Sequence, residues 1–377
     1  MILMAIPAIA REFSISYVDA STLLSFYVAT EVLLSIPFSL LAERVGVRKV
    51  MIMGTAIMAL SSLLIVLSSS FSLILLLRVF QGVGASMVLL TSLSYASLTG
   101  SDEERGRMIG LNHTIVSLGY VFGLPLGGII AEINWKYLFA LTSVLSLISL
   151  YLLFSLNEVY VKSGFGISVI YASLTFDGVI LGLYYPPLFL LSLIGLVMTL
   201  WRIRLGREFY LTSLSGFLHS VTRNMMAAFF VLYLYSLHLP GTVVGSLVLL
   251  YPLSFTLVSL YAGRLHDKYK LKVAALGFAS MALSSLSIAL NVILGEFLMG
   301  ASSGVATTSN TAYTMSSVED KNRVVASGIR SVQGVVSNAI GLIIASYLRT
   351  SLLPYIGITI LLNLASLLII VLLSKIA

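Results

Sequence analysis

The feature that most constrains this chain is a nearly unbroken series of apolar stretches, each long enough to cross a bilayer as a helix. A membrane-spanning helix needs about 20 predominantly apolar residues. Because 58% of the residues are hydrophobic and only 10% are charged, the chain requires the bilayer as its solvent. The sequence predicts an all-α, polytopic membrane protein with fourteen spans, the first incomplete, near residues 1–10, 20–42, 48–67, 70–93, 108–131, 136–156, 165–183, 187–203, 209–236, 241–262, 271–290, 292–315, 323–347 and 352–374.

The basic residues give an independent test of this span order. If alternate loops lie on opposite sides of the membrane, sixteen lysines and arginines fall on one side, whereas the other side holds Arg11, Lys136 and Arg349. Cytoplasmic loops carry such an excess of basic residues, so the bias places the C-terminus in the cytoplasm. The net charge of +7 is therefore spread over short loops. It does not form the single basic patch that nucleic-acid binding requires.

The two ends of the chain resemble each other. The segment 39–48 reappears as 263–272, and the segment 77–82 is echoed by 295–300. Gly110 before one span likewise matches Gly328 before another. Parallel repeats with a substrate path between them are a common architecture of secondary transporters. Residues 158–208 lie between the repeats and have no counterpart.

Four motifs now identify a family resemblance. Leu41–Lys49 resembles the loop motif of the major facilitator superfamily, and Leu77–Ala85 resembles its fourth-helix motif. Gly119–Gly128 is similar to the fifth-helix glycine and proline motif of its antiporters, followed by Asn134–Phe139 as in the drug:proton antiporters. The sequence departs from the family pattern at Glu43, where aspartate is usual, at Ser39, where glycine is usual, and at Pro125, which sits one place late.

The resemblance implies the fourteen-helix, multidrug-efflux branch of that superfamily. The expected architecture is an N-terminal bundle at residues 1–157, two linking helices at 158–208 and a C-terminal bundle at 209–377. These are two six-helix bundles with two extra central helices. Residues 5–10 resemble the outer half of the family's first helix. We therefore expect a truncated first helix here, with two alternatives: a native chain that begins upstream, which we favour, or a chain that is itself shortened.

The resemblance also assigns roles to the loop and the glycines. The loop motif and its repeat would form a clasp that pairs with the opposite half and stabilises one access state, as in a bistable switch. The glycine faces would allow close helix packing. The predicted switch residues are Glu43, Arg44, Gly46, Arg48, Lys49, Asp267 and Lys268, and the predicted packing residues are Gly82, Gly84, Gly119, Gly123, Pro125, Gly127 and Gly128.

Charged residues inside spans are the sharpest functional signal, because each is costly unless it faces a cavity or a partner. Glu31 lies deepest of the carboxylates, near the middle of the second predicted span. We expect it to accept a coupling proton or attract a cationic substrate, with a structural pair as the alternative. The resemblance gives Arg78 a role in proton transfer. Glu296 occupies its equivalent position in the repeat, which predicts that the two charges pair across the halves. The remaining candidates for proton coupling or for lining the substrate cavity are Arg223 and Arg330.

These features predict a secondary active transporter, with proton-coupled export of amphipathic or cationic small molecules by alternating access. A carrier of one endogenous metabolite is the alternative, and a non-transporting sensor or a channel is a further one. No phosphate-binding loop for ATP is present, and we find no catalytic cluster, so neither an enzyme nor a cofactor is predicted. The expected partners are a small molecule, protons and the lipid bilayer of the plasma membrane, with a monomer sufficing for this fold.

Overall fold

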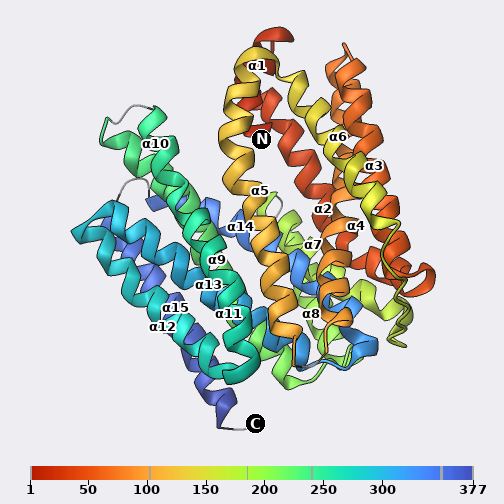
Figure 1. The fold of residues 1–377 in the computed structure, drawn as a ribbon, viewed down its shortest axis with the longest axis vertical. Coiled ribbons are helices and arrows are strands. Elements are labelled where there is room, and N and C mark those ends of the chain that lie inside the picture. The colour runs from red at the N-terminus through yellow and green to blue at the C-terminus, as the bar shows by residue number, and fades with distance from the viewer. Residues whose placement is uncertain (1, 102, 185, 239–240, 349–350, 376–377) are drawn as a thin grey trace. The chain divides into compact units, whose positions relative to one another are not determined.

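A computed structural model describes the chain except for residues 1, 102, 185, 239–240, 349–350 and 376–377 (Figure 1). Within these described residues the secondary structure is helical and contains no strand, which confirms the predicted all-α class. The α-helices are α1 (Ile2–Glu12), α2 (Tyr17–Val45), α3 (Val47–Leu67), α4 (Phe71–Thr99), α5 (Arg105–Asn134), α6 (Lys136–Leu153), α7 (Ile170–Tyr184), α8 (Phe189–Arg202), α9 (Arg207–Ser236), α10 (Gly241–Val248), α11 (Leu250–Tyr269), α12 (Leu271–Leu290), α13 (Val292–Ser316), α14 (Arg323–Leu348) and α15 (Leu352–Ser374).

Length and apolar composition qualify eight helical stretches of the described residues to cross a membrane. Three further helices, α5, α9 and α13, have the length to span but carry more polar side chains. In α13 these polar side chains, among them Glu296 and Asn310, are buried inside the protein. Polar groups within a membrane helix face the bundle interior, so α13 is an inner helix. The eight qualifying stretches are Thr22–Val45, Val47–Leu67, Phe71–Thr99, Lys136–Leu153, Ser246–Tyr269, Leu271–Leu290, Asp320–Leu348 and Leu352–Ser374.

The structure places a one-residue break inside one predicted span. The stretch 241–262 forms two helices, because α10 ends at Val248 and α11 begins at Leu250. Pro252 explains the interruption, since its ring clashes with the carbonyl group four residues earlier and it has no backbone N–H. That carbonyl group belongs to Val248. The described residues therefore contain fifteen α-helices where fourteen spans were predicted.

The two helices between the repeats form a tight hairpin. A Cβ atom at Gly178 of α7 would lie 2.8 Å from Ser192 Cα, and one at Gly195 of α8 would lie 2.8 Å from the Leu174 carbonyl carbon. The absence of side chains at both glycines lets the two backbones touch. The segments observed, 166–184 and 186–202 including short 3₁₀ turns, agree closely with the predicted spans.

Contacts divide the chain into two compact units. Unit 1 comprises Met1–Tyr95, Phe122–Arg204 and Asp320–Val335, and unit 2 comprises Ala96–Val121, Leu205–Glu319 and Val336–Ala377. Each unit therefore combines segments from both sequence repeats, with α4, α5 and α14 divided between the units. The predicted division at residues 157 and 208 describes the repeats and stays a prediction.

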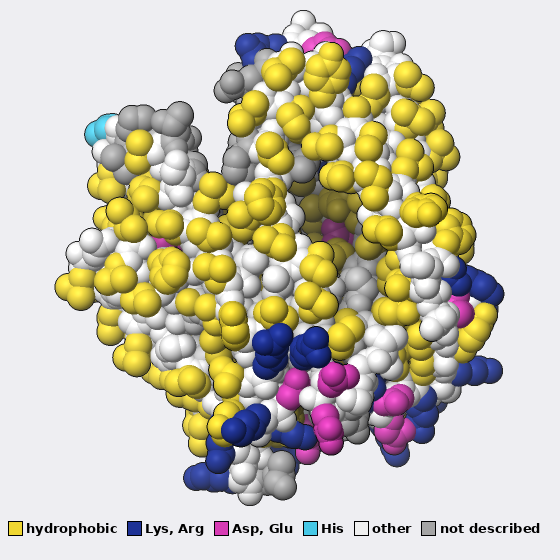
Figure 2. Space-filling model, viewed as in Figure 1, with side chains coloured by type: hydrophobic (Ala, Val, Ile, Leu, Met, Phe, Trp, Pro, Cys, Tyr) yellow, Lys and Arg dark blue, Asp and Glu magenta, His cyan; other side chains and the backbone are white. Residues whose placement is uncertain are grey.

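Hydrophobic side chains cover the flanks of the helices, and charged side chains gather at helix ends (Figure 2). Large apolar residues stand fully outward on α12 and α15, where Leu283 and Leu361 are 69% and 67% exposed. Such exposure is unfavourable in water but favourable against lipid chains. The outer surface thus has the character expected of a protein embedded in a bilayer.

Candidate functional site

Gly82 allows α4 to lie directly against α2. A Cβ atom at Gly82 would lie 2.5 Å from the Tyr27 carbonyl oxygen and 2.8 Å from Thr30 Cβ. Gly84 approaches α3 in the same way, since its Cβ atom would lie 2.6 Å from the Gly54 carbonyl oxygen. These separations leave no room for a side chain. The two glycines of the fourth-helix motif therefore hold α4 close to both neighbouring helices.

Arg78, one turn before this contact, is held by several neutral groups. Its side chain is 6% exposed, and Nε donates to the Leu23 carbonyl oxygen at 3.0 Å. Nη1 donates to the Gln81 side-chain oxygen, and Gln81 in turn donates to Ser62 Oγ at 2.6 Å. The guanidinium group also lies over the ring of Tyr27, 4.3 Å from its centre, in a cation–π contact. These contacts fix the position of the arginine without neutralising its charge.

Glu31 lies on the same helix as Tyr27, one turn beyond it, and is 7% exposed. It interacts electrostatically with Arg78, so the structure brings together the two leading candidates from the sequence. An ionised carboxylate inside a membrane protein is costly unless a cation supports it. The fixed arginine supplies that support, and a bound proton removes the need for it. This pair is therefore chemically suited to exchanging a proton for another cation.

The second pair of candidates lies in unit 2. Glu296 on α13 is 2% exposed, and Arg223 on α9 is partly buried. Both interact electrostatically with Tyr251 on α11. Pairing of Glu296 with Arg78 stays a prediction. Arg330 belongs to unit 1, where it donates to the Gln333 side-chain oxygen at 3.2 Å.

The loop between α2 and α3 is fixed by a carboxylate that follows α6. The backbone N–H groups of Arg48 and Lys49 donate to Glu158 at 2.8 and 3.2 Å, which caps the start of α3. Gly46 has φ +111°, a backbone conformation that side chains rarely adopt. A Cβ atom there would also lie 2.5 Å from Glu158 Oε1. The loop thus requires glycine at this position on two grounds.

The side chains of this loop bind within unit 1. Arg48 donates to the carbonyl oxygens of Leu153 and Phe154 at 2.9 and 2.6 Å, at the end of α6. Lys49 donates to the Tyr160 hydroxyl at 3.0 Å. Glu43 is hydrogen-bonded by Ser163, while Arg44 is exposed. The described cation that acts on Glu43 is Lys162 of the linking segment, so the predicted clasp between Glu43 and the other repeat stays a prediction.

The repeat of this loop, at residues 263–272 in unit 2, makes different contacts. Asp267 accepts hydrogen bonds from the backbone N–H groups of Gly106 and Arg107 at 2.7 and 3.0 Å. It thereby caps the start of α5, where a negative charge is favoured by the helix dipole. Lys268 lies over the ring of Tyr269, 5.1 Å from its centre. In this loop a carboxylate from the second repeat binds a helix of the first repeat.

The glycines of α5 have mixed surroundings. Gly123 and Gly127 are buried, whereas the Cβ position of Gly119 is open, with no atom within 4 Å. The surroundings of Pro125 and Gly128 lie outside the described residues. A continuous packing face along this motif stays a prediction.

Two polar side chains with specific contacts were not singled out in the sequence. Glu158 was not singled out, although it is the carboxylate nearest the end of α6. His219 lies within α9, is 1% exposed, and hydrogen-bonds Asn363 and Ser303. An ionisable residue in the middle of an apolar span is the signal that could have found it.

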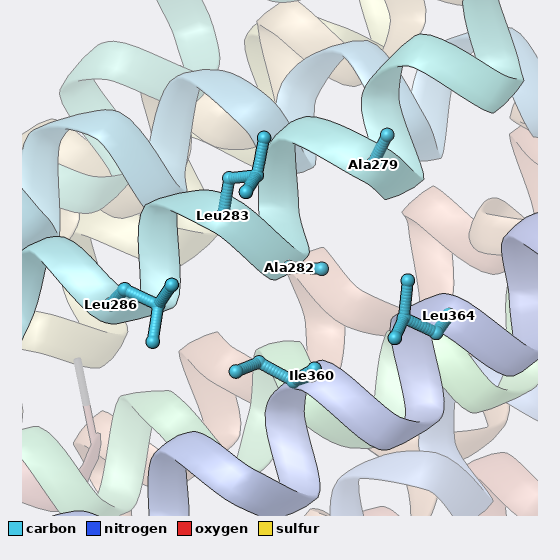
Figure 3. A pocket seen from close by; sticks show the side chains of 6 residues that line it. All are labelled: Ala279, Ala282, Leu283, Leu286, Ile360 and Leu364. Atoms are coloured by element: carbon cyan, nitrogen blue, oxygen red, sulfur yellow. The ribbon is translucent and has the colours of Figure 1, made fainter.

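An apolar groove on unit 2 differs from both candidate pairs. It has a volume of about 300 Å³ and lies between α12 and α15 (Figure 3). Its lining side chains, labelled in Figure 3, are all apolar; they belong to Ala279, Ala282, Leu283, Leu286, Ile360 and Leu364. This groove offers no group that could bind a proton or a charged ligand.

A metal site does not emerge from the described part of the chain. Among those residues, no group of three histidines, cysteines or carboxylates is placed to hold a metal ion.

The family model of the Major Facilitator Superfamily matches residues 1–211 and 212–376. The chain belongs to the Major Facilitator Superfamily. This superfamily consists of transporters, so membership supports the prediction that the chain is not an enzyme. The narrower assignment to its fourteen-helix antiporter branch is not established by this match.

Similar proteins agree with the superfamily assignment. The riboflavin transporter RibZ of Clostridioides difficile is 29% identical over 39% of this chain, and the synaptic vesicular amine transporter of Rattus norvegicus is 34% identical over 29%. The matched stretches span 32% and 21% of these relatives, less than two thirds of their length. The Major Facilitator Superfamily transporter FucP, solved in the outward conformation, shares the fold with a TM-score of 0.75, covering 97% of this chain and 92% of that chain at 12% identity.

Proposed function

We propose that this chain is a secondary active transporter that exports amphipathic or cationic small molecules in exchange for protons. The observation that carries the proposal is the buried Glu31 beside the fixed Arg78. Such a carboxylate binds a proton or a cation, but not both at once. Competition between the two for one group is the simplest physical basis of antiport.

Arg78 sets the balance of this competition. Its contacts with Leu23, Gln81 and Tyr27 keep it in place when Glu31 gains or loses a proton. A fixed positive charge favours the ionised form of Glu31, while the apolar surroundings oppose it. Access to the two sides of the membrane would then determine when the proton leaves and the substrate binds. In this proposal Arg223 and Arg330 line the substrate path.

The loops would control the change of access. The bonds from the start of α5 to Asp267 are neither fully buried nor numerous. Such contacts break and reform at modest cost, as a bistable element requires. With the charge bias of the loops, they would lie on the cytoplasmic side of the plasma membrane, as would the C-terminus. The chain would act as a monomer in the bilayer, without nucleic acid or a cofactor.

Transport of one specific metabolite is the second candidate. The similarity to a riboflavin transporter favours it, because riboflavin is a flat aromatic compound without the charge of a cation. A carrier of this kind would not need Glu31 for substrate recognition. Removal of the Glu31 charge should therefore impair recognition of a cationic substrate but not of an uncharged metabolite.

Inverted membrane vesicles with an acidic interior provide the test. Addition of ethidium or tetraphenylphosphonium should release protons from vesicles that contain the protein, and Glu31→Gln should abolish this release. Glu103→Gln changes an exposed carboxylate in the same way and should leave the release intact. Proton release by riboflavin but not by the cations would favour the metabolite carrier. Equal release by the wild type and Glu31→Gln would overturn the role of this carboxylate.

A further inference from the structure

The apolar groove between α12 and α15 of unit 2 lies open to the surroundings of the protein (Figure 3). Its lining side chains Leu283 and Leu364 are 69% and 48% exposed. Ala279 and Ala282 also line it, and their short side chains leave the hollow between the two helices. Water finds no hydrogen-bond partner in an apolar hollow of this kind. In a bilayer the groove is therefore suited to an apolar chain, such as the acyl chain of a lipid.

Helical periodicity places a lysine on the groove-lining face of α12. This residue is Lys272, in the first turn of the helix. Leu276, Ala279 and Leu283 follow it at intervals of four, three and four residues. Residues three and four apart lie on one face of an α-helix. Because Leu276 is 63% exposed, the face between the lysine and the groove is both open and apolar.

The same periodicity places a second lysine on the groove-lining face of α15. From Leu364 in the groove, Leu368 and Leu372 follow at intervals of four residues, and they are 58% and 49% exposed. Lys375 comes three residues later, directly after the end of the helix, and keeps a helical backbone conformation with φ −92° and ψ −12°. An exposed apolar face thus leads from the groove to a lysine on each helix.

The two lysines lie at the same end of the helix pair. Leu271 and Leu373 belong to one buried hydrophobic cluster, so the start of α12 meets the end of α15. At a rise of about 1.5 Å per residue, the groove begins about 10 Å from the lysine of α12 and about 17 Å from that of α15. Half of the hydrocarbon core is about 15 Å thick. With both lysines at the level of the lipid head groups, the groove lies at the depth of the acyl chain ends of that leaflet.

Both lysine side chains are exposed and available to a ligand. Neither Lys272 nor Lys375 makes a side-chain hydrogen bond or an ion pair within the described part of the chain. The matching cation of unit 1 behaves differently, because Arg48 donates to the carbonyl oxygens of Leu153 and Phe154 at the end of α6. Unit 2 therefore presents two ammonium groups where unit 1 uses its cation to bind a helix end.

Carboxylates on the neighbouring segments have other partners. Glu208, at the start of α9, accepts a hydrogen bond from the Tyr313 hydroxyl at 3.1 Å. Asp267 accepts from two backbone N–H groups of α5. Lys268 and Lys270, in the turn before α12, are exposed cations that add to the positive charge. This end of the groove therefore favours an anionic ligand.

We infer that the groove binds an anionic phospholipid, with an acyl chain on the apolar lining and the phosphate group between Lys272 and Lys375. Basic groups at helix ends recognise anionic head groups in this way. The apolar lining supplies affinity for any lipid, and the two lysines supply the preference for negative charge. A second copy of the chain is a poorer occupant, because a symmetric contact in the membrane would bring its own two lysines to the same level.

Native mass spectrometry tests this inference on the full chain released from nanodiscs that contain equal amounts of phosphatidylglycerol and phosphatidylcholine. We expect one retained phosphatidylglycerol, favoured over phosphatidylcholine by about thirtyfold. The double variant Lys272→Gln/Lys375→Gln should reduce this preference to less than about threefold. Ala279→Leu fills part of the groove and should weaken retention of both lipids without changing their ratio.

A matched control removes as much charge outside the groove. Lys268→Gln/Arg204→Gln changes two exposed cations and should keep the preference of the wild type, as should Lys272→Arg/Lys375→Arg. Circular dichroism verifies that each variant is folded. The measurement involves neither transport nor Glu31, so the inference and the proposed function can fail separately.

Four results would overturn the inference. They are equal retention of the two lipids by the wild type, an unchanged preference in Lys272→Gln/Lys375→Gln, displacement of the lipid by inorganic phosphate, and a dimer of the chain without bound lipid as the retained species.

Discussion

Two equivalent helix contacts, one in each unit, differ in how closely the helices approach. In unit 2, a Cβ atom at Gly110 of α5 would lie 2.7 Å from the Ser259 carbonyl oxygen of α11. In unit 1, a Cβ atom at Gly328 of α14 would lie 3.5 Å from the Ser35 carbonyl oxygen of α2. The first separation excludes a side chain, whereas the second is an ordinary contact.

The difference in helix separation follows from one position of the repeat, which is glycine in unit 2 and serine in unit 1. Gly263 faces α5 in unit 2, and its Cβ atom would lie 2.9 Å from the Gly106 carbonyl carbon. Ser39 occupies the matching position in unit 1, where its Cβ atom would lie 3.3 Å from a Cβ atom added at Gly328. The serine side chain therefore occupies the space that lets the helices touch in unit 2, and it holds α2 away from α14.

The matching carboxylates of the two repeated loops also differ between the units in what they bind. Asp267 reaches the start of α5 and caps it, but Glu43, at the matching position, is hydrogen-bonded by Ser163. Glu158 takes the capping role in unit 1, although on α3. One repeated loop has thus produced a closely packed, helix-capping contact in unit 2 and a looser contact in unit 1. We expect the α5–α11 contact to be the more stable of the two.

The largest effect should come from adding a side chain at the close contact. Gly263→Val would place methyl groups against the Gly106 backbone and force the helices apart, which we expect to destabilise the protein by about 3 kcal/mol. The unfolding midpoint in detergent measures this. Ser39→Val, the matched change in unit 1, should lower the free energy of unfolding by less than half as much. Equal losses of stability in the two variants would contradict the distinction between the two helix contacts.

Removing the charge of Asp267 should have the next largest effect. Asp267→Asn keeps the shape but leaves one of its two backbone donors with a weaker partner and loses the favourable charge at the start of α5. We expect a loss of about 1.5 kcal/mol, measured as the change in thermal unfolding midpoint. A midpoint unchanged at low salt would show that Asp267 does not stabilise this helix.

The cap of α3 should be slightly weaker. Glu158→Gln is expected to destabilise the protein by about 1 kcal/mol, because its hydrogen bonds to Arg48 and Lys49, at 2.8 and 3.2 Å, are longer than those of Asp267. Hydrogen exchange of these two amides should accelerate in the variant. Protection equal to that of the wild type would contradict the assignment of Glu158 as the cap.

The smallest effect should come from Glu43→Gln. Its hydrogen-bonding side chain is retained, and no helix start among the described residues depends on it, so we expect less than about 0.5 kcal/mol. The same thermal assay applies. A loss as large as that of Asp267→Asn would mean that the two repeated carboxylates are equivalent, and the comparison of the units would fail.

Much of the fold followed from local patterns in the sequence. Apolar length located most helices to within a few residues, including the short hairpin at 166–202. The division of 241–262 was missed because apolar length gives no weight to Pro252, whose effect on the preceding turn breaks the helix. The number of helices therefore depended on backbone chemistry that hydropathy does not contain.

The candidate site was predictable only in part. Glu31 and Arg78 stood out because charge is rare within apolar spans, and the structure brings them together. The neutral partners of Arg78, namely Leu23, Tyr27 and Gln81, have no such signal, since backbone and aromatic groups occur throughout the chain. That Glu158, and not Glu43, caps the start of α3 depends on which distant segments the fold brings together, which residue types alone do not specify.

The central claim is that Glu31 couples transport to protons, and one comparison in proteoliposomes tests it most directly. Uptake of tetraphenylphosphonium driven by a pH gradient is measured beside exchange of labelled for unlabelled compound at equal pH, in the wild type and in Glu31→Gln. Exchange needs no net proton movement, so we predict that Glu31→Gln loses the gradient-driven uptake and retains the exchange. Gradient-driven uptake in Glu31→Gln at the rate of the wild type would contradict the account.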